Sequence, residues 1–445
     1  MRFKTSAPSP PPLPAFSMPG DLPLNGCDFL MLGFDHEMRR HGYAGNSCQI
    51  ELELDSAISP DVLRKRITEL VNRHPILRAR PGGWFMPKWK LPRTLFVASA
   101  SSVPSVRVHR EAPGLREKLC DEPLNMKRGE LFRFDLIERA GGRMNVIFTW
   151  AHTLMDANSA EHFVALVGRD DVPLPAIEQP VSTRPQKTFV ERLKLSRKSV
   201  LQFDEFIKAQ PRTVGVRFPN APKVQRFCVE RFSAEETARV RANGVKLCGA
   251  FGGAQFHASA AMVELHQLHQ RIGSVSASYV LPVPVSLRAK GSVEPLFCNQ
   301  LTMMMTQFLP QHLDTTANAV AALKPQIAQA MRDGLIEAGV AIADISRCLP
   351  LAPYLFILKS GLRGEICSFF YGDTAAVTPL LTSFCGANIR DFTHVGATTP
   401  SPGIGAIFYS FRGEQRVTVF HLETHFTAVE AGSFAKALRA RLLNP

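Results

Sequence analysis

The segment Trp150–Phe163, WAHTLMDANSAEHF, places His152 four residues before Asp156. A histidine with a pKa near 6.5 can take a proton from a hydroxyl, thiol or amine at neutral pH. A nearby carboxylate can orient that histidine, or can bind an arginine and hold the loop rigid. The spacing alone is weak, because a chain of this composition contains about half an HxxxD pair by chance. A buried histidine beside an N-capping Asp156 explains the same residues without chemistry.

The pair stands between a predicted strand and a predicted helix. Gly129–Glu138 and Arg143–Trp150 read as two strands joined at Gly141-Gly142, which is a hairpin signal. After Asp156, a helical period returns at Ala157, Ala160, Phe163, Val164 and Val167. The end of a strand is where α/β proteins expose functional side chains, so the position favours a role for His152.

Strands and helices are predicted in both halves of the chain. In the first half, Cys48–Leu54 alternates like a strand, and Ser59-Pro60 begins a helix with one apolar stripe. In the second half we predict a capping box and six elements: Ser233–Glu236 for the box, a helix over Ala250–Arg271, a strand ending in LPVPVSLR, a helix over Thr316–Gly339, strands over Ile404–Phe411 and Arg416–Thr424, and a helix over Ala431–Leu443.

Length and composition indicate a globular protein of two domains or lobes. The chain has 445 residues, of which 45% are hydrophobic and 20% charged. We expect a Pro-rich disordered lead-in over 1–20, a first lobe over 21–175, a connection over 176–225 and a second lobe over 226–445. Every apolar run ends well short of the ~18 residues of a membrane span, and the start lacks the apolar core of a secretory signal. We therefore expect a cytoplasmic protein.

Nine scattered cysteines without a CxxC spacing favour neither a zinc site nor a disulfide framework, so reduced thiols are expected. The formal charge of +13 raises the question of nucleic acid, but the sequence has no zinc finger, aromatic RNA-binding signature or long basic tract. The charge equally suits phosphate-bearing thioesters or an acidic carrier protein. Basic residues are densest over Arg184–Arg217, where Phe189, Leu193, Val200 and Phe203 predict an amphipathic helix with a solvated charged face.

Four segments, in order, resemble one superfamily. Trp150–Gly168 resembles the HHxxxDG segment of the acyltransferases that include chloramphenicol acetyltransferase, the condensation domains of peptide synthetases, the plant BAHD enzymes and the wax-ester synthases. LVNRHPILRARPGG (Leu70–Gly83) resembles an early RHxxLR segment of condensation domains. VPVSLRAKG…FCNQL (Val283–Leu301) and SFCGANIRDFTHVG (Ser383–Gly396) resemble the "vPvxLR…GN" segment and the late "SNLG" turn. The match spans roughly residues 21–443.

The resemblance implies an α/β fold of two lobes, like chloramphenicol acetyltransferase, with a mixed sheet and flanking helices in each lobe. It implies that His152 is the general base and that Asp156 is structural, bound to an arginine for which Arg288 is our candidate. Three further residues are candidates to line an acyl-donor tunnel or steady an oxyanion: Asn299, Ser383 and Asn388.

The same resemblance implies thioester-dependent transfer to a small-molecule hydroxyl or amine acceptor. Acyl-CoA or acyl-phosphopantetheine would be the co-substrate, and an acyl or peptidyl carrier protein a potential partner. We expect no metal, no permanently bound cofactor, no nucleic acid and a monomer.

The sequence departs from the motif at both ends. Ala151 replaces the first histidine, and Ala157 replaces a glycine whose position can require a special backbone angle. Three alternatives therefore stay open. They are a free-standing condensation domain forming an amide, a degenerate carrier-binding module without activity, and a nucleic-acid-binding protein.

Overall fold

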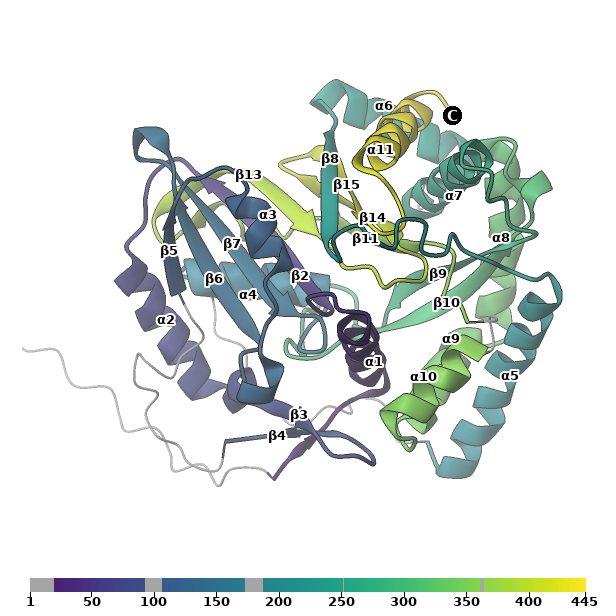
Figure 1. The fold of residues 1–445 in the computed structure, drawn as a ribbon, viewed down its shortest axis with the longest axis horizontal. Helices are drawn as coiled ribbons and strands as arrows, with labels where there is room; N and C mark the ends of the chain where they lie inside the picture. Colours follow the sequence, from purple (N-terminus) through teal and green to yellow (C-terminus); the bar gives the residue numbers. More distant parts are fainter. Residues whose placement is uncertain (1–19, 93–105, 173–186, 251, 361–363) are drawn as a thin grey trace, which may run out of the picture.

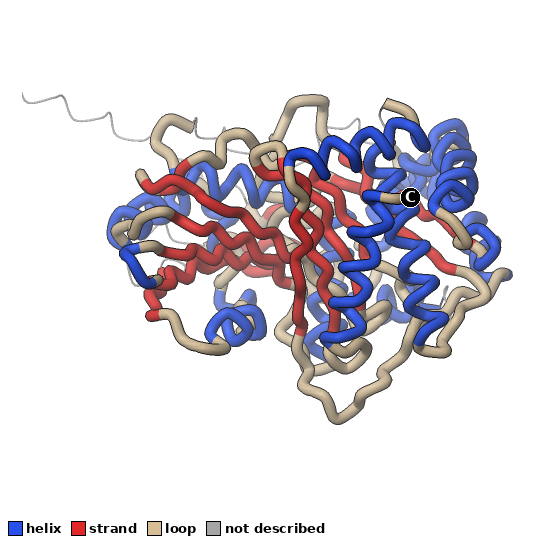
Figure 2. Tube along the Cα trace, turned by 90° about the horizontal axis from the view of Figure 1, so that it is seen from above, coloured by secondary structure: helices blue, strands red, loops and turns tan. Residues whose placement is uncertain are grey.

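A computed structural model describes residues 20–92, 106–172, 187–250, 252–360 and 364–445 of the chain. Except for Gly20, the predicted lead-in lies outside these residues. The described part forms two lobes side by side, each with strands covered by helices (Figure 1). Seen from above, the strands run through the middle of the molecule, and helices of the second lobe gather on its outer side (Figure 2).

The first lobe contains a six-stranded mixed sheet with the order β12-β13-β2-β7-β6-β5. The strands are β2 (Ser47–Leu54), β5 (Val106–Arg110), β6 (Phe132–Glu138), β7 (Met144–Ala151), β12 (Ser383–Phe384) and β13 (Ala387–Val395). The helices are α2 (Pro60–Arg73), α3 (Leu115–Asp121) and α4 (Ala157–Gly168). The predicted hairpin is confirmed, since β6 pairs antiparallel with β7 across Ala140–Gly142. The predicted stripe of α2 is buried, at Leu63, Ile67, Leu70 and Val71.

The second lobe contains a four-stranded sheet with the order β11-β14-β15-β8, and a separate antiparallel pair of β9 and β10. The strands are β8 (Gln225–Arg231), β9 (Tyr279–Ser286), β10 (Leu301–Phe308), β11 (Phe370–Ala376), β14 (Ile404–Phe411) and β15 (Glu414–Leu422). The helices that cover them are α6 (Ala234–Cys248), α7 (Gly253–Arg271), α8 (Thr316–Arg332) and α11 (Ala428–Leu443). The predicted capping box forms at the start of α6, where Ser233 and Glu236 bond each other's backbone amides.

Four further helices and a small sheet occupy the space beside and below the lobes (Figure 1). The elements are α1 (Gly26–Arg40), α5 (Phe189–Lys208), α9 (Leu335–Ser346), α10 (Leu351–Ser360), β1 (Leu22–Pro23), β3 (Arg80–Gly82) and β4 (Lys88–Lys90). Helix α9 packs against both α1 and α5. The approach of α1 to α9 requires a glycine, because a Cβ on Gly26 would lie 2.6 Å from the backbone of Ala343.

The late part of the chain returns to the first lobe. Strand β13 pairs antiparallel with β2, so residues 387–395 belong to the first sheet although they follow most of the second lobe. Strand β13 therefore connects the two lobes. Together with the two sheets, this arrangement confirms the predicted two-lobed α/β fold.

Two predicted helices have different bounds. The helix predicted over Thr316–Gly339 is two helices, because Gly334 adopts a left-handed conformation (φ 68°) that ends α8 before α9 begins. The helix predicted from Ala250 begins at Gly253, after the turn that follows α6. Hydrophobic periodicity alone did not detect either break, since the apolar pattern continues across both turns.

The amphipathic helix predicted in the basic region forms as α5, but most of its predicted apolar stripe is exposed. Phe189, Leu193 and Val200 are exposed, Phe203 is partly buried against the buried Phe206, and Ser196 and Ser199 are buried. The helix therefore presents an apolar surface to solvent, which the sequence pattern did not predict.

All nine cysteines are free, as expected. Among the described residues, no helix is long and apolar enough to cross a membrane.

Candidate active site

His152 directly follows the last residue of β7. Its backbone N–H donates to the carbonyl of Asn46 (3.0 Å), and the N–H of Leu154 donates back to Ala151 (2.9 Å), which closes a tight turn. The indole of Trp150 donates to the carbonyl of Met155 (3.1 Å). These bonds fix the loop between β7 and α4 from both ends. The strand therefore determines where the imidazole lies.

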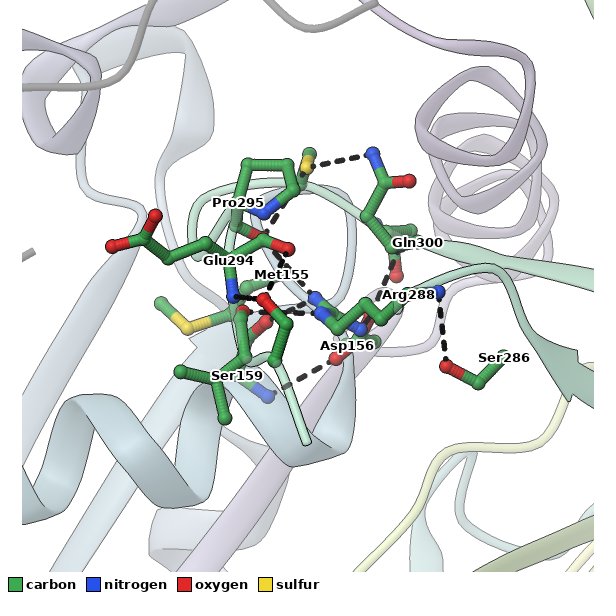
Figure 3. Close-up of polar contacts among 12 residues, drawn as sticks. Met155, Asp156, Ser159, Ser286, Arg288, Glu294, Pro295 and Gln300 are labelled. Carbon is green, nitrogen blue, oxygen red and sulfur yellow. Dashed lines mark hydrogen bonds and ion pairs between the residues drawn. The ribbon is translucent and has the colours of Figure 1, made fainter. Parts of the chain in front are cut away.

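Asp156 ends this loop and caps α4. Its Oδ1 accepts the N–H of Ser159 (3.0 Å), and its Oδ2 accepts Nη1 of Arg288 (2.6 Å) and the N–H of Gln300 (3.0 Å). Figure 3 shows Arg288 reaching across to Asp156 and Ser159. Arg288 also donates to the hydroxyl of Ser159 (2.6 Å) and to the carbonyls of Val293 and Pro295. The structure thus brings together the two residues that the resemblance paired, and the carboxylate points away from solvent and into this network.

Asn299 joins the His152 loop to helix α1. Its side-chain amide donates to the carbonyl of His152 (2.8 Å) and to Oδ1 of Asp28 (2.9 Å), and its backbone N–H donates to the same Asp28 oxygen (2.8 Å). Asn25 in turn donates to the carbonyl of Asn299 (3.0 Å). The position of Asn299 therefore depends on the loop of the first lobe and on α1, and its side-chain N–H groups are used by these contacts rather than directed into a tunnel.

Burial dominates the electrostatics of this site. It lowers the pKa of His152 below its usual value, although the negative charge of Asp156 and the side chain of Asn299 act in the opposite direction. The imidazole is therefore neutral at pH 7, as a general base requires. Burial also raises the pKa of Asp28 to about 7, against the hydrogen bonds from Asn299 and Asn25 that favour its charged form.

A second histidine, His394, lies on strand β13. The His394 ring is 5.6 Å from the Trp150 ring, and its Nδ1 is 3.6 Å from Oε1 of Glu161 on α4; both side chains are buried. Neither residue, nor Asp28, was identified from the sequence. Two signals were present. Asn25 and Asp28 have the spacing of a capping box, and His394 lies inside the late Ser383–Gly396 segment.

A cavity of about 670 Å³ lies next to this loop, between α1, α5, α9, α10 and β10. Much of its lining is apolar, including Leu30, Phe34, Met303, Leu358, Ile366 and Phe370. Asn299 and Gln300 line its inner end, whereas the side chain of His152 does not line it. Cys27 lines it too, but burial and the charge of Asp28 raise the pKa of its thiol, so it is not a thiolate nucleophile. A volume of this size accepts an organic substrate.

Ser383 and Asn388 are not at this site. They pair with each other across β12 and β13, and Asn388 binds Asp55 at the far end of β2 through its backbone and side chain. The turn that carries His152 is near the opposite end of β2, where Ser47 pairs with Ala151. The late segment runs along the whole strand, so its first residues and His394 are at different ends of the sheet. The prediction that Ser383 and Asn388 line the site is therefore not supported.

The two alanines of the motif have ordinary backbones. Ala151 is the buried last residue of β7, and Ala157 is the first residue of α4 with no positive φ. The alanine at 157 therefore introduces no strain into the loop. The described part of the chain contains no cluster of three histidine, cysteine or acidic residues that could hold a metal ion.

Comparisons with known proteins agree with this geometry. No protein-family model matches the sequence, and no curated protein matches it. Solved structures do match. The trichothecene 15-O-acetyltransferase TRI3 of Fusarium sporotrichioides superposes with a TM-score of 0.72 at 13% identity, over 99% of each chain. The first condensation domain of the CDA synthetase gives 0.67 at 14% identity, over 96% of this chain and 97% of that one. The condensation domain of the Monacolin K polyketide synthase MokA gives 0.61 at 14% identity, over 96% and 98%.

The chain has the condensation-domain and chloramphenicol acetyltransferase-like fold. The match covers nearly the whole chain, so the resemblance seen in four short segments is confirmed at the level of the fold. In this fold, the loop between β7 and α4 carries His152 and Asp156, and the second lobe supplies Arg288 and Asn299.

Proposed function

We propose that this protein is an acyltransferase that moves an acyl group from a thioester to a hydroxyl or amine acceptor, with His152 as general base. The observation that carries the proposal is the Asn299 bridge, which fixes the backbone of a neutral, partly exposed histidine at the meeting point of two lobes. Asn299 thereby holds the loop that carries the imidazole against the other lobe, as the positioning of a general base requires.

The reaction needs one proton transfer and one bond exchange. The imidazole of His152 takes the proton from the acceptor hydroxyl or amine while its oxygen or nitrogen attacks the thioester carbonyl carbon. The carbon–sulfur bond then breaks, and the thiolate leaves with the proton that His152 returns. General-base assistance of this kind contributes about 10²–10⁴ in rate, and holding both substrates together supplies much of the rest.

Asp156 and Arg288 have a structural role in this proposal. Both carboxylate oxygens of Asp156 accept hydrogen bonds, from Ser159, Arg288 and Gln300, so neither oxygen is directed at a substrate. The pair connects the start of α4 to the segment after β9, which fixes the loop of His152 relative to the second lobe. Asn299 likewise acts on the histidine backbone and is a positioning residue.

The cavity supports an apolar substrate portion, since its lining is mostly aliphatic, aromatic and methionine side chains. The charge of +13 supports a donor that carries phosphate, either coenzyme A or the phosphopantetheine of a carrier protein. Both donors present the same thioester to the site. The acceptor and the acyl chain are to be found by assay.

The test is a panel of acyl-CoA and acyl-carrier thioesters, each offered with alcohol and amine acceptors and assayed for free thiol and for acylated product. Wild type should release thiol in an acceptor-dependent manner, and His152→Ala should lose this activity. His36→Ala is a matched control, because His36 is an exposed histidine of α1. If wild type transfers no acyl group, but wild type and His152→Ala both bind the carrier protein, the chain is a non-catalytic binding module. If only amines are acylated, it is a condensation-type enzyme.

A further inference from the structure

Exposed apolar side chains stand on three elements that contribute to the lining of the cavity. Trp84 (80% exposed) belongs to the loop between β3 and β4, Phe356 (74%) to α10 and Phe189 (63%) to α5. More exposed apolar residues stand on the same three elements: Phe85, Met86, Val190, Leu193, Val200, Leu201 and Ile357. We call these ten residues the apolar rim. Single exposed apolar residues are common, but ten on three neighbouring elements require an explanation.

Three residues of the apolar rim line the cavity itself. Met86, Val200 and Ile357 come from three different elements, yet all three line the same cavity as Phe34 and Phe370 in its interior. The elements lie along the lower edge of the molecule, away from the two large sheets (Figure 1). An apolar path therefore leads from the outer surface of this edge toward Asn299.

The first part of helix α5 has its apolar side turned outward. The helix buries Phe206 near its end, but before that it buries Ser196 and Ser199 while Leu193 and Val200 remain exposed. Burying apolar area stabilises by about 25 cal/mol per Å², so a helix that only packed on its neighbours would bury the leucine and valine instead. The orientation is favourable if an apolar environment covers the outer side.

Basic residues accompany the apolar rim. Lys187–Lys198 contains five basic residues against one acid, Glu191. Strand β4 adds two exposed lysines, Lys88 and Lys90. Lys90 forms an ion pair with Asp21. Within the described residues, Arg192, Lys194 and Arg197 form no ion pair with a carboxylate. Surfaces that lie in the interface of an anionic bilayer combine tryptophan and phenylalanine with lysine and arginine.

We propose that the apolar rim docks on an anionic lipid surface, and that the cavity takes up an apolar substrate from that surface. The docking half stands by itself. The uptake half rests on the proposed acyltransferase function. An acidic protein would match the charge, but the projecting tryptophan and phenylalanine rings favour a deformable apolar phase over a preformed surface.

Trp84 provides a direct readout. The chain has three tryptophans, and Trp89 and Trp150 are buried. Intrinsic fluorescence of the full chain is recorded with vesicles of phosphatidylcholine alone and of equimolar phosphatidylcholine and phosphatidylglycerol, each made with brominated lipid. We expect quenching with the anionic vesicles that disappears in Trp84→Phe, together with cosedimentation that falls as salt is raised.

Variants separate the rim from the rest of the surface. Trp84→Ala/Phe356→Ala and Arg192→Gln/Arg197→Gln should each weaken vesicle binding by about tenfold or more. The controls are Met331→Ala/Val429→Ala and Arg241→Gln/Lys246→Gln, exposed residues outside the rim, which should bind like wild type. Thermal unfolding of all variants checks that they fold.

The outcomes distinguish the two proposals. Equal vesicle binding by rim variants and controls, absence of quenching, or binding of an acidic carrier protein through the rim in place of vesicles would overturn the docking proposal. Thiol release from soluble thioesters measures the acyltransferase function separately. Docking without any thiol release contradicts the function and leaves the docking site standing.

Discussion

The Nη1 atom of Arg288 lies 2.6 Å from Oδ2 of Asp156, and each side chain is only 5% exposed. The two residues come from different lobes, so this ion pair is a contact between lobes as well as the cap of α4. Removing one partner would leave the other charge buried without compensation, which is the costly way to break such a pair.

Arg288→Met should therefore lower the free energy of unfolding by about 3–5 kcal/mol. Urea denaturation measures this change. The double variant Arg288→Met/Asp156→Asn should recover part of the loss, because no unpaired charge remains. A single variant as stable as wild type would show that the pair does not hold the lobes together.

His152→Ala should reduce kcat by about 10²–10⁴ while the melting temperature stays close to that of wild type. The hydrogen bonds that hold the loop use the His152 backbone, whose N–H donates to Asn46 and whose carbonyl accepts from Asn299, and both remain when the imidazole is removed. Kinetics and thermal unfolding are measured on the same preparations, with His36→Ala as control. A large loss of stability in His152→Ala would instead indicate a structural histidine.

The pH dependence should follow the neutral imidazole. Because burial lowers the pKa of His152, the basic form is present at and above neutral pH and is lost only as the pH falls through this lowered value. We expect kcat/KM to rise with pH, with a midpoint below 6.5, and then to remain level through neutrality. A rise centred above 7 would point to another base.

Asn299→Ala should slow the reaction by disturbing the position of His152. The change removes the donor to the His152 carbonyl and one of two Asn299 donors to Asp28, and each lost bond to a buried group costs about 1–3 kcal/mol. A positioning role predicts a fall in kcat with the pH midpoint moved, because the Asn299 side chain raises the pKa of His152. Loss of stability with an unchanged midpoint would make Asn299 purely structural.

Asp28 should make stability depend on pH. Its folded pKa of about 7 lies above the unfolded value, so the folded state binds an extra proton between about pH 4 and 7. Its contribution is complete below the unfolded pKa and is lost as the pH rises through about 7. Relative to Asp28→Asn, wild type should therefore lose up to about 1.4 kcal/mol per pH unit over this range. Parallel curves for the two proteins would contradict the raised pKa.

Much of the fold followed from local patterns in the sequence. Alternation at Met144–Trp150 predicted a strand, although both faces of β7 are buried, and the stripe from Leu63 to Val71 predicted a helix whose one apolar face is buried. The placement of His152 at the end of that strand was equally local. The pairing of Asp156 with Arg288 came from the resemblance, since 132 residues separate them in the chain.

Only the tertiary structure decided which distant residues complete the site. Asp28 is connected to the His152 loop only through Asn299, a residue 271 positions away in the chain that bonds both. The sequence did not show which end of β13 lies near His152. The end with His394 lies near it and the end with Asn388 does not, because the register of β13 against β2 is determined by packing. The exposure of the apolar side chains of α5 is likewise determined by how the helix packs on its neighbours in the chain. Periodicity shows that a helix has an apolar side, but only its neighbours determine whether that side is covered.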